Sequence, residues 1–154
     1  MVDMSTLSYR TLTGDKDILS YESISRGSFT ECYMSGQKVY CATDVLDTSK
    51  AILSQMRHKN LPLYVCVGTM GGYPLYECPR YLFGAPDADA AYIRGELCRI
   101  NTSSPFSGRF EIPDDIMSAL RMVEPYVAMW DFKFDNLAFN GRDIILLDVF
   151  VGKN

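Results

Sequence analysis

The pattern of apolar and polar residues divides this chain into a first half of short strands and a second half that begins with helices. Short apolar runs separated by glycine-containing turns cover residues 18–43, and two more such runs follow at residues 61–67 and 73–78. Apolar runs of this length, bounded by glycine, are typical of strands joined by tight turns. The pattern therefore predicts a five-stranded antiparallel sheet in the first half.

Helical spacing of apolar residues occurs in three segments. Residues 48–59 follow Asp47, a candidate N-cap, and carry apolar side chains on one face. Two further helices are expected over residues 86–99 and 114–127. Pro125 should end or kink the last helix, because proline lacks the backbone donor that a helix interior needs.

The last third of the chain holds its strongest hairpin signal. Asn140-Gly141 separates two apolar runs, residues 137–139 and 144–147. Both turn residues tolerate the positive φ that a two-residue hairpin turn requires. The sequence therefore predicts a β-hairpin here.

Polar side chains lie at both open ends of this predicted hairpin. Antiparallel pairing should place Asn136, at the start of the first strand, beside Asp148, at the end of the second. Asp131 precedes Asn136 by five residues. An amide and two carboxylates form an oxygen-rich corner suited to Mg²⁺ and phosphate. A solvated hairpin with ordinary turn-forming residues is the alternative interpretation.

Composition favours a folded protein of one domain, or of two lobes of a small one. The chain has 154 residues, of which 47% are hydrophobic and 22% charged. No apolar run approaches the roughly 20 residues that span a bilayer, and the N-terminus lacks the features of a signal peptide. The net charge is −4 without a basic stripe, which argues against nucleic-acid binding. We expect a cytoplasmic protein with no membrane or nucleic-acid partner.

The cysteines argue against a structural zinc site. They form no Cys-x-x-Cys pair, and His58 is the single histidine of the chain. A scattered, odd-numbered set predicts buried reduced thiols in a cytosol. The five positions are Cys32, Cys41, Cys66, Cys78 and Cys98.

Residues 129–150 resemble the catalytic loop and metal-binding corner of protein kinases, His-Arg-Asp-x-x-x-x-Asn followed by a hairpin and Asp-Phe-Gly. Met129-Trp130 stands in place of His-Arg, and Val149-Phe150 in place of Phe-Gly. The resemblance implies catalytic roles for Asp131 as the base and Lys133 as the catalytic-loop lysine, and metal-ligand roles for Asn136 and Asp148.

Residues 25–33 resemble a kinase glycine-rich loop in which the central glycine, the phenylalanine and the closing tyrosine are kept. An ordinary hairpin with a glycine bulge is the alternative. The helix after the third strand contains no glutamate, so both members of the usual Lys–Glu pair are missing. Lys50 is the one nearby substitute, and we expect it to be an exposed first-turn lysine. The nucleotide-binding residues that the resemblance implies are Gly27, Ser28, Phe29, Cys41 at the position of the strand lysine, and Glu77 and Cys78 in a hinge.

Taken together, residues 18–150 resemble the small protein kinases of podovirus-type bacteriophages. The resemblance implies a minimal protein-kinase-like α+β fold. Its N-terminal lobe, residues 1–80, would hold a five-stranded antiparallel sheet with one helix. After the hinge, residues 81–154 would form a reduced, mainly helical C-terminal lobe with a β-hairpin. The implied role is takeover of a bacterial host by phosphorylation of host proteins and shut-off of host transcription.

Three functional hypotheses follow from these observations. Loss of the strand lysine, two loop glycines, the glycine of Asp-Phe-Gly and the peptide-binding helices favours a pseudokinase that binds and modulates a bacterial host protein. The alternative is an active minimal serine/threonine kinase that uses ATP and Mg²⁺. The third is a small α+β interaction protein with no relation to nucleotides.

Overall fold

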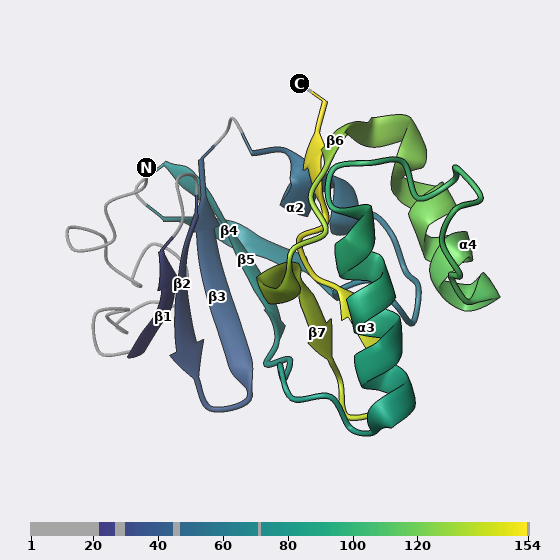
Figure 1. The fold of residues 1–154 in the computed structure, drawn as a ribbon. Coiled ribbons are helices and arrows are strands. Elements are labelled where there is room, and N and C mark those ends of the chain that lie inside the picture. The colour runs from purple at the N-terminus through teal and green to yellow at the C-terminus, as the bar shows by residue number, and fades with distance from the viewer. Residues whose placement is uncertain (1–21, 27–29, 45–46, 71, 154) are drawn as a thin grey trace. The chain divides into compact units, whose positions relative to one another are not determined.

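The computed structural model describes residues 22–26, 30–44, 47–70 and 72–153 (Figure 1). The chain divides into two compact units. Met1–Ser54 and Leu63–Arg80 form the first, and Gln55–Pro62 and Tyr81–Asn154 form the second. The segment Gln55–Pro62 thus belongs to the second unit, although it lies between two stretches of the first.

The first unit is built on an antiparallel sheet with the strand order β1-β2-β3-β5-β4. Gly36, with φ of +61°, closes the turn between β2 and β3, where a side chain would be strained. The strands are β1 (Glu22–Arg26), β2 (Thr30–Ser35), β3 (Lys38–Thr43), β4 (Val65–Met70) and β5 (Tyr73–Pro79).

Helix α2 of the first unit is much shorter than the sequence predicts. It covers only Ser49–Leu53, although the apolar spacing predicts a helix over residues 48–59. The N-cap residue is Thr48 and not the predicted Asp47, although the Asp47 carboxylate accepts hydrogen bonds from Ser49 N at 3.1 Å and Ser49 Oγ at 2.7 Å.

Tertiary hydrogen bonds explain why the helix ends early. Beyond Ser54 the chain enters the second unit, where buried Asn60 donates from Nδ2 to Ile144 O at 2.9 Å and accepts from Leu146 N at 2.8 Å. Lys59 adds an ion pair with Asp115 at 2.9 Å. These bonds to residues far along the chain outweigh local helix propensity, which is a weak preference.

The second unit combines two helices with two separate two-stranded sheets. Strands β6 and β9 form one sheet, and β7 and β8 form the other. Two short 3₁₀ turns, Glu124–Tyr126 and Phe134–Asn136, precede β6 and β7. The helices and strands are α3 (Ala88–Ile100), α4 (Asp114–Val123), β6 (Val127–Trp130), β7 (Leu137–Phe139), β8 (Ile144–Leu146) and β9 (Phe150–Gly152).

The predicted fold class is therefore wrong. The chain is α+β, but residues 81–154 do not form the mainly helical lobe of the predicted minimal kinase-like architecture, because small sheets lie beside helices of 13 and 10 residues. The sequence pattern indicated one hairpin there and missed the pairing of β6 with β9. These two strands are separated by about 20 residues of chain, and such pairing has no local signal.

The predicted β7–β8 hairpin is confirmed, but its turn differs from the expected one. Gly141 has φ of +93°, whereas Asn140 does not take a positive φ. Instead, Asn140 Oδ1 accepts hydrogen bonds from Arg142 N at 3.0 Å and Asp143 N at 2.7 Å. A short polar side chain can close a turn in this way by bonding the backbone two residues on.

Pro125 ends the last helix as predicted, since α4 stops at Val123 and a 3₁₀ turn containing Pro125 follows.

Aromatic side chains form a core around Trp130, the last residue of β6. Trp130 stacks on Phe132 with ring centroids 5.5 Å apart and meets Phe106 and Phe150 edge-on at 6.0 and 6.5 Å. Because Trp130 is the single tryptophan of the chain, its fluorescence reports on this unit alone.

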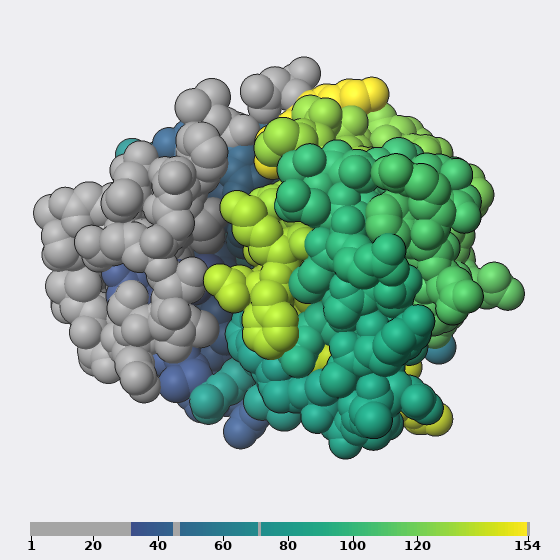
Figure 2. Space-filling model, viewed as in Figure 1, coloured from purple at the N-terminus to yellow at the C-terminus, as the bar shows by residue number. Residues whose placement is uncertain are grey.

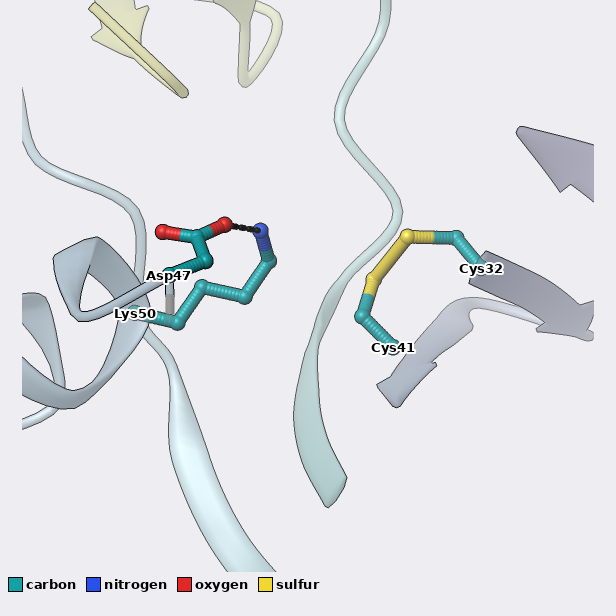
Figure 3. Close-up of a disulfide and its surroundings, with 4 residues drawn as sticks. All are labelled: Cys32, Cys41, Asp47 and Lys50. Atoms are coloured by element: carbon teal, nitrogen blue, oxygen red, sulfur yellow. Dashed lines mark ion pairs between the residues drawn. A yellow bond between two sulfur atoms is a disulfide. The ribbon is translucent and has the colours of Figure 1, made fainter. Parts of the chain in front are cut away.

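Two cysteines contradict the expectation of reduced thiols. Cys32 on β2 and Cys41 on β3 form a disulfide (Figure 3), while Cys66, Cys78 and Cys98 are free. Spacing along the sequence did not reveal the pair, because their contact depends on the register of β2 against β3.

Among the helices of the described ranges, none has the length and apolar character needed to cross a membrane.

Candidate functional site

The loop that carries the kinase-like residues lies between β6 and β7 and is fixed at its start by backbone bonds. Asp131 N donates to Val149 O at 2.7 Å, and Phe132 N donates to Asn101 O at 2.9 Å. The Phe132 side chain is buried in the aromatic core. Asp131 is consequently half-buried at the loop base, and Lys133 projects into solvent.

Hydrogen bonds connect three of the four predicted residues of this loop and hairpin. Asn136 Nδ2 donates to Asp131 O at 2.9 Å and lies 3.4 Å from Asp131 Oδ2. Asn136 O accepts from Asp148 N at 3.3 Å. The hairpin thus places Asp148 next to Asn136, as the pairing argument expects, although the link to Asp148 runs through the backbone.

Lys133 joins this group through its charge. Its ammonium lies 3.7 Å from Asp131 Oδ1, and the lysine side chain is 69% exposed. An ion pair in such an exposed position contributes little to stability, because water screens it. The pair nevertheless places a cation beside the carboxylate that the kinase resemblance assigns as the base.

Oxygen atoms are the ligands that hard cations such as Mg²⁺ prefer. The side chains of this corner supply fewer oxygen atoms than such an ion needs. Among the described residues, no group of three or more His, Cys, Asp or Glu side chains is arranged to hold a metal ion. Asp131, Asn136 and Asp148 supply two carboxylates and one amide. Mg²⁺ bound there would need water or phosphate oxygens to complete its six ligands.

The residues that the resemblance assigns to nucleotide binding are in the first unit. Gly27, Ser28 and Phe29 lie outside the described residues. Cys41 is buried and disulfide-bonded, so it offers no cation in place of the strand lysine. Glu77 pairs with Lys38 at 3.4 Å.

The side chain of Cys78 is also inaccessible to a ligand. It is buried, and burial raises the pKa of its thiol to about 12. Its neighbour Glu77 lies opposite both Tyr40 on β3 and Val65 on β4. The backbone at Glu77 is therefore engaged in two ladders, whereas the proposed hinge role needs backbone groups that can meet an adenine ring.

Lys50 is the residue that the sequence placed wrongly. It is 5% exposed, not a solvated first-turn lysine. Its ammonium lies 4.0 Å from Asp47 Oδ2 and 5.5 Å from the centre of the Tyr64 ring. Figure 3 shows the Lys50 side chain extending from α2 toward the carboxylate of Asp47. No local signal marks this burial, because it depends on how α2 packs on the sheet.

A second feature that the sequence did not indicate is an exposed apolar group beside the loop. Leu82, Phe83 and Phe134 are exposed, and we call them the Phe134 surface. Arg94 of α3 connects them. Its guanidinium lies 4.0 Å from the Phe134 ring centre, and its Nη1 donates to Phe83 O at 2.6 Å.

Backbone pairing also fixes this surface. Leu82 N donates to Phe139 O at 2.8 Å, and Phe139 N donates to Leu82 O at 2.7 Å. The segment carrying Leu82 and Phe83 therefore continues the β7–β8 sheet by one residue pair. In Figure 2, yellow-green atoms of the chain around residues 130–140 reach the surface beside the green atoms of α3.

No protein-family model, curated protein or solved structure matches this chain. The resemblance to protein kinases therefore rests on the sequence motifs alone.

Proposed function

We propose that this protein acts by binding another protein through the Phe134 surface, and that its kinase-like loop is catalytically impaired. The proposed partner is a bacterial host protein, which is the class that the sequence resemblance implies. The observation that carries the proposal is the exposed Phe134 ring held in place by Arg94.

The chemistry of this surface supports a binding role. Aromatic and arginine side chains are enriched among the residues that dominate binding energy. Phe134 is 53% exposed, yet the guanidinium of Arg94 and the β7 backbone restrain the residues around it. A side chain that is already ordered loses less conformational entropy when a partner covers it, which favours affinity.

The first unit supports the second part of the proposal, impaired catalysis. In the kinase resemblance a lysine on the third strand contacts the phosphates, and Cys41 occupies that position here as part of a disulfide. Lys50, which the sequence suggests as a substitute, is buried, and Asp47 already lies 4.0 Å from its ammonium. Losing one charge-assisted contact costs about 1.5–3 kcal/mol, which corresponds to a rate loss of about 10- to 100-fold.

Replacing Phe134 with serine should weaken partner binding by about 30-fold, since truncating a dominant aromatic contact costs about 2 kcal/mol. The full chain is immobilised, and proteins captured from a bacterial lysate are identified by mass spectrometry. The dissociation constant of each purified candidate is then measured for the parent and Phe134→Ser chains.

Met129→Ser is the matched control for this experiment. Met129 is 50% exposed on β6 of the same unit, and it does not belong to the Phe134 surface. We expect this control to bind like the parent chain. Equal affinity of the parent and Phe134→Ser chains for every captured protein would refute the proposed surface.

Phosphoryl transfer remains the second candidate function, because the Asn136 amide and the Asp131 carboxylate lie together beside Asp148. Under the binding proposal we expect no change in melting temperature with Mg-ATP. A bound nucleotide at 100 times its dissociation constant would add about 2.7 kcal/mol to the unfolding free energy. Transfer of radiolabelled phosphate that disappears in both Asp131→Ala and Asp148→Ala would establish the enzyme and overturn impaired catalysis.

A further inference from the structure

The Cys32–Cys41 disulfide joins two residues that the hairpin already holds together. They are directly opposite each other in the β2–β3 ladder, with Cα atoms 4.1 Å apart. Backbone pairs running from Thr30↔Thr43 to Ser35↔Lys38 set this register. Since the register of paired strands does not depend on the disulfide, both thiols should remain adjacent after reduction.

The two sulfur-bearing residues differ in their access to solvent. Cys41 is 3% exposed, whereas Cys32 is half-buried. Thiol–disulfide exchange requires the attacking thiolate to contact the sulfur that it attacks. An external thiol therefore approaches Cys32 more easily than Cys41, and attack at Cys32 makes Cys41 the leaving sulfur.

The remaining cysteines of the first unit do not compete for this pair. Cys78 lies near Cys41, because Val39 pairs with Cys78 and Cys41 pairs with Tyr76. Burial raises the pKa of the Cys78 thiol to about 12, so it is almost entirely protonated at neutral pH, and only a thiolate exchanges.

Cys66 on β4 is exposed but too far away. It pairs with Tyr76 on β5, which places β5 between it and Cys41. Two strand spacings amount to about 9–10 Å, and cysteines with Cα atoms more than about 7 Å apart cannot be bridged without backbone movement. The pair on β2 and β3 is therefore isolated within the first unit.

We propose that Cys32 and Cys41 form a reversible thiol–disulfide site, and that a low-molecular-weight thiol of the glutathione class enters it at Cys32. The thiolate forms a bond to Cys32 Sγ, the disulfide bond breaks, and its electron pair stays on Cys41 Sγ, which takes up a proton. A second thiolate attacks the sulfur of the small molecule and releases Cys32. Two small thiols are thereby oxidised to one disulfide while the protein disulfide is reduced to two thiols.

The test uses full-length chains in which Cys66→Ser and Cys98→Ser remove the two other thiols that are not buried. Chains with Cys41→Ser or Cys32→Ser are incubated with glutathione disulfide at neutral pH, quenched with acid and analysed by mass spectrometry. We expect Cys32 in the Cys41→Ser chain to take up one glutathione at least 10 times faster than Cys41 in the Cys32→Ser chain. Equal rates at the two positions would overturn the assignment of Cys32 as the entry sulfur.

A second measurement needs no substitution in the pair and remains decisive if a variant does not fold. The native chain is exposed briefly to reduced glutathione, its free thiols are alkylated, and peptide mapping locates the mixed disulfide. We expect glutathione on Cys32 and a newly alkylated Cys41. Glutathione on Cys41 or Cys78, or a disulfide that is reduced only after the chain is unfolded in urea, would contradict the proposal.

Discussion

Replacing Phe139 with alanine should lower the unfolding free energy of the second unit by about 3–5 kcal/mol, the usual cost of removing a buried phenylalanine. Phe139 is fully buried in β7. Its ring also lies 5.1 Å from the guanidinium of Arg94. The substitution therefore removes core packing and one of the two rings against which Arg94 packs.

Urea unfolding followed by Trp130 fluorescence measures this loss, because the tryptophan belongs to the same unit. Phe134→Ala is the matched control. It removes the same number of atoms from an exposed ring, and surface substitutions usually change stability by less than about 0.5 kcal/mol. Because Phe134 packs against Arg94, we expect the loss of unfolding free energy in this control to lie slightly above that value. A Phe139→Ala loss no greater than that of Phe134→Ala would contradict the core role of β7.

Neutralising Asp47 should destabilise the first unit by about 3 kcal/mol, because it leaves the buried ammonium of Lys50 without its counter-charge. Asp47→Asn is the suitable change. It keeps a side-chain oxygen for the hydrogen bonds from Ser49, which are 3.1 and 2.7 Å long in the parent. The variant therefore removes the charge and retains the acceptor for the Ser49 hydrogen bonds at the start of α2.

The double variant Asp47→Asn with Lys50→Met tests the reason for this loss. Once methionine replaces the buried cation, no charge remains to be neutralised, and an apolar side chain of similar length is tolerated in a core. We expect the second substitution to recover at least about 2 kcal/mol. Amide hydrogen exchange of β3 and β5 provides the measurement for this unit. If the two substitutions were simply additive, Lys50 would not depend on Asp47.

The hairpin at β7 and β8 was predictable because its signal is local. Asn140-Gly141 lies between two apolar runs, and the strands pair as expected from Leu137↔Leu146 to Phe139↔Ile144. The approach of Asn136 to Asp148 followed from the same pairing. Closing the short loop between adjacent segments costs little conformational entropy, so their sequence pattern is sufficient to predict the pairing.

The prediction of a helix over residues 48–59 was wrong, because distant contacts decide where this helix ends. Its apolar spacing is genuine, yet Asn60 bonds to Ile144 and Leu146, and the helix ends at Leu53. Those partners lie more than 80 residues away, and no periodicity within a helix can reveal them. The same limit applies to Arg94, whose contacts with Phe83 and Phe134 join three separate segments.

The amino-acid sequence by itself indicated strands in the first half, although two observed strands, β1 and β4, have bounds that differ from the predicted ones. It also indicated the end of the last helix near Pro125 and the meeting of Asn136 with Asp148, because each follows from turn chemistry or short-range periodicity. Only the tertiary structure decided the antiparallel pairing of β6 with β9, the burial of Lys50 and the pairing of Cys32 with Cys41. These features depend on which distant segments exclude water together. Hydrophobic burial is non-directional. The residues next to a buried side chain in the sequence therefore do not indicate which distant segment it packs against.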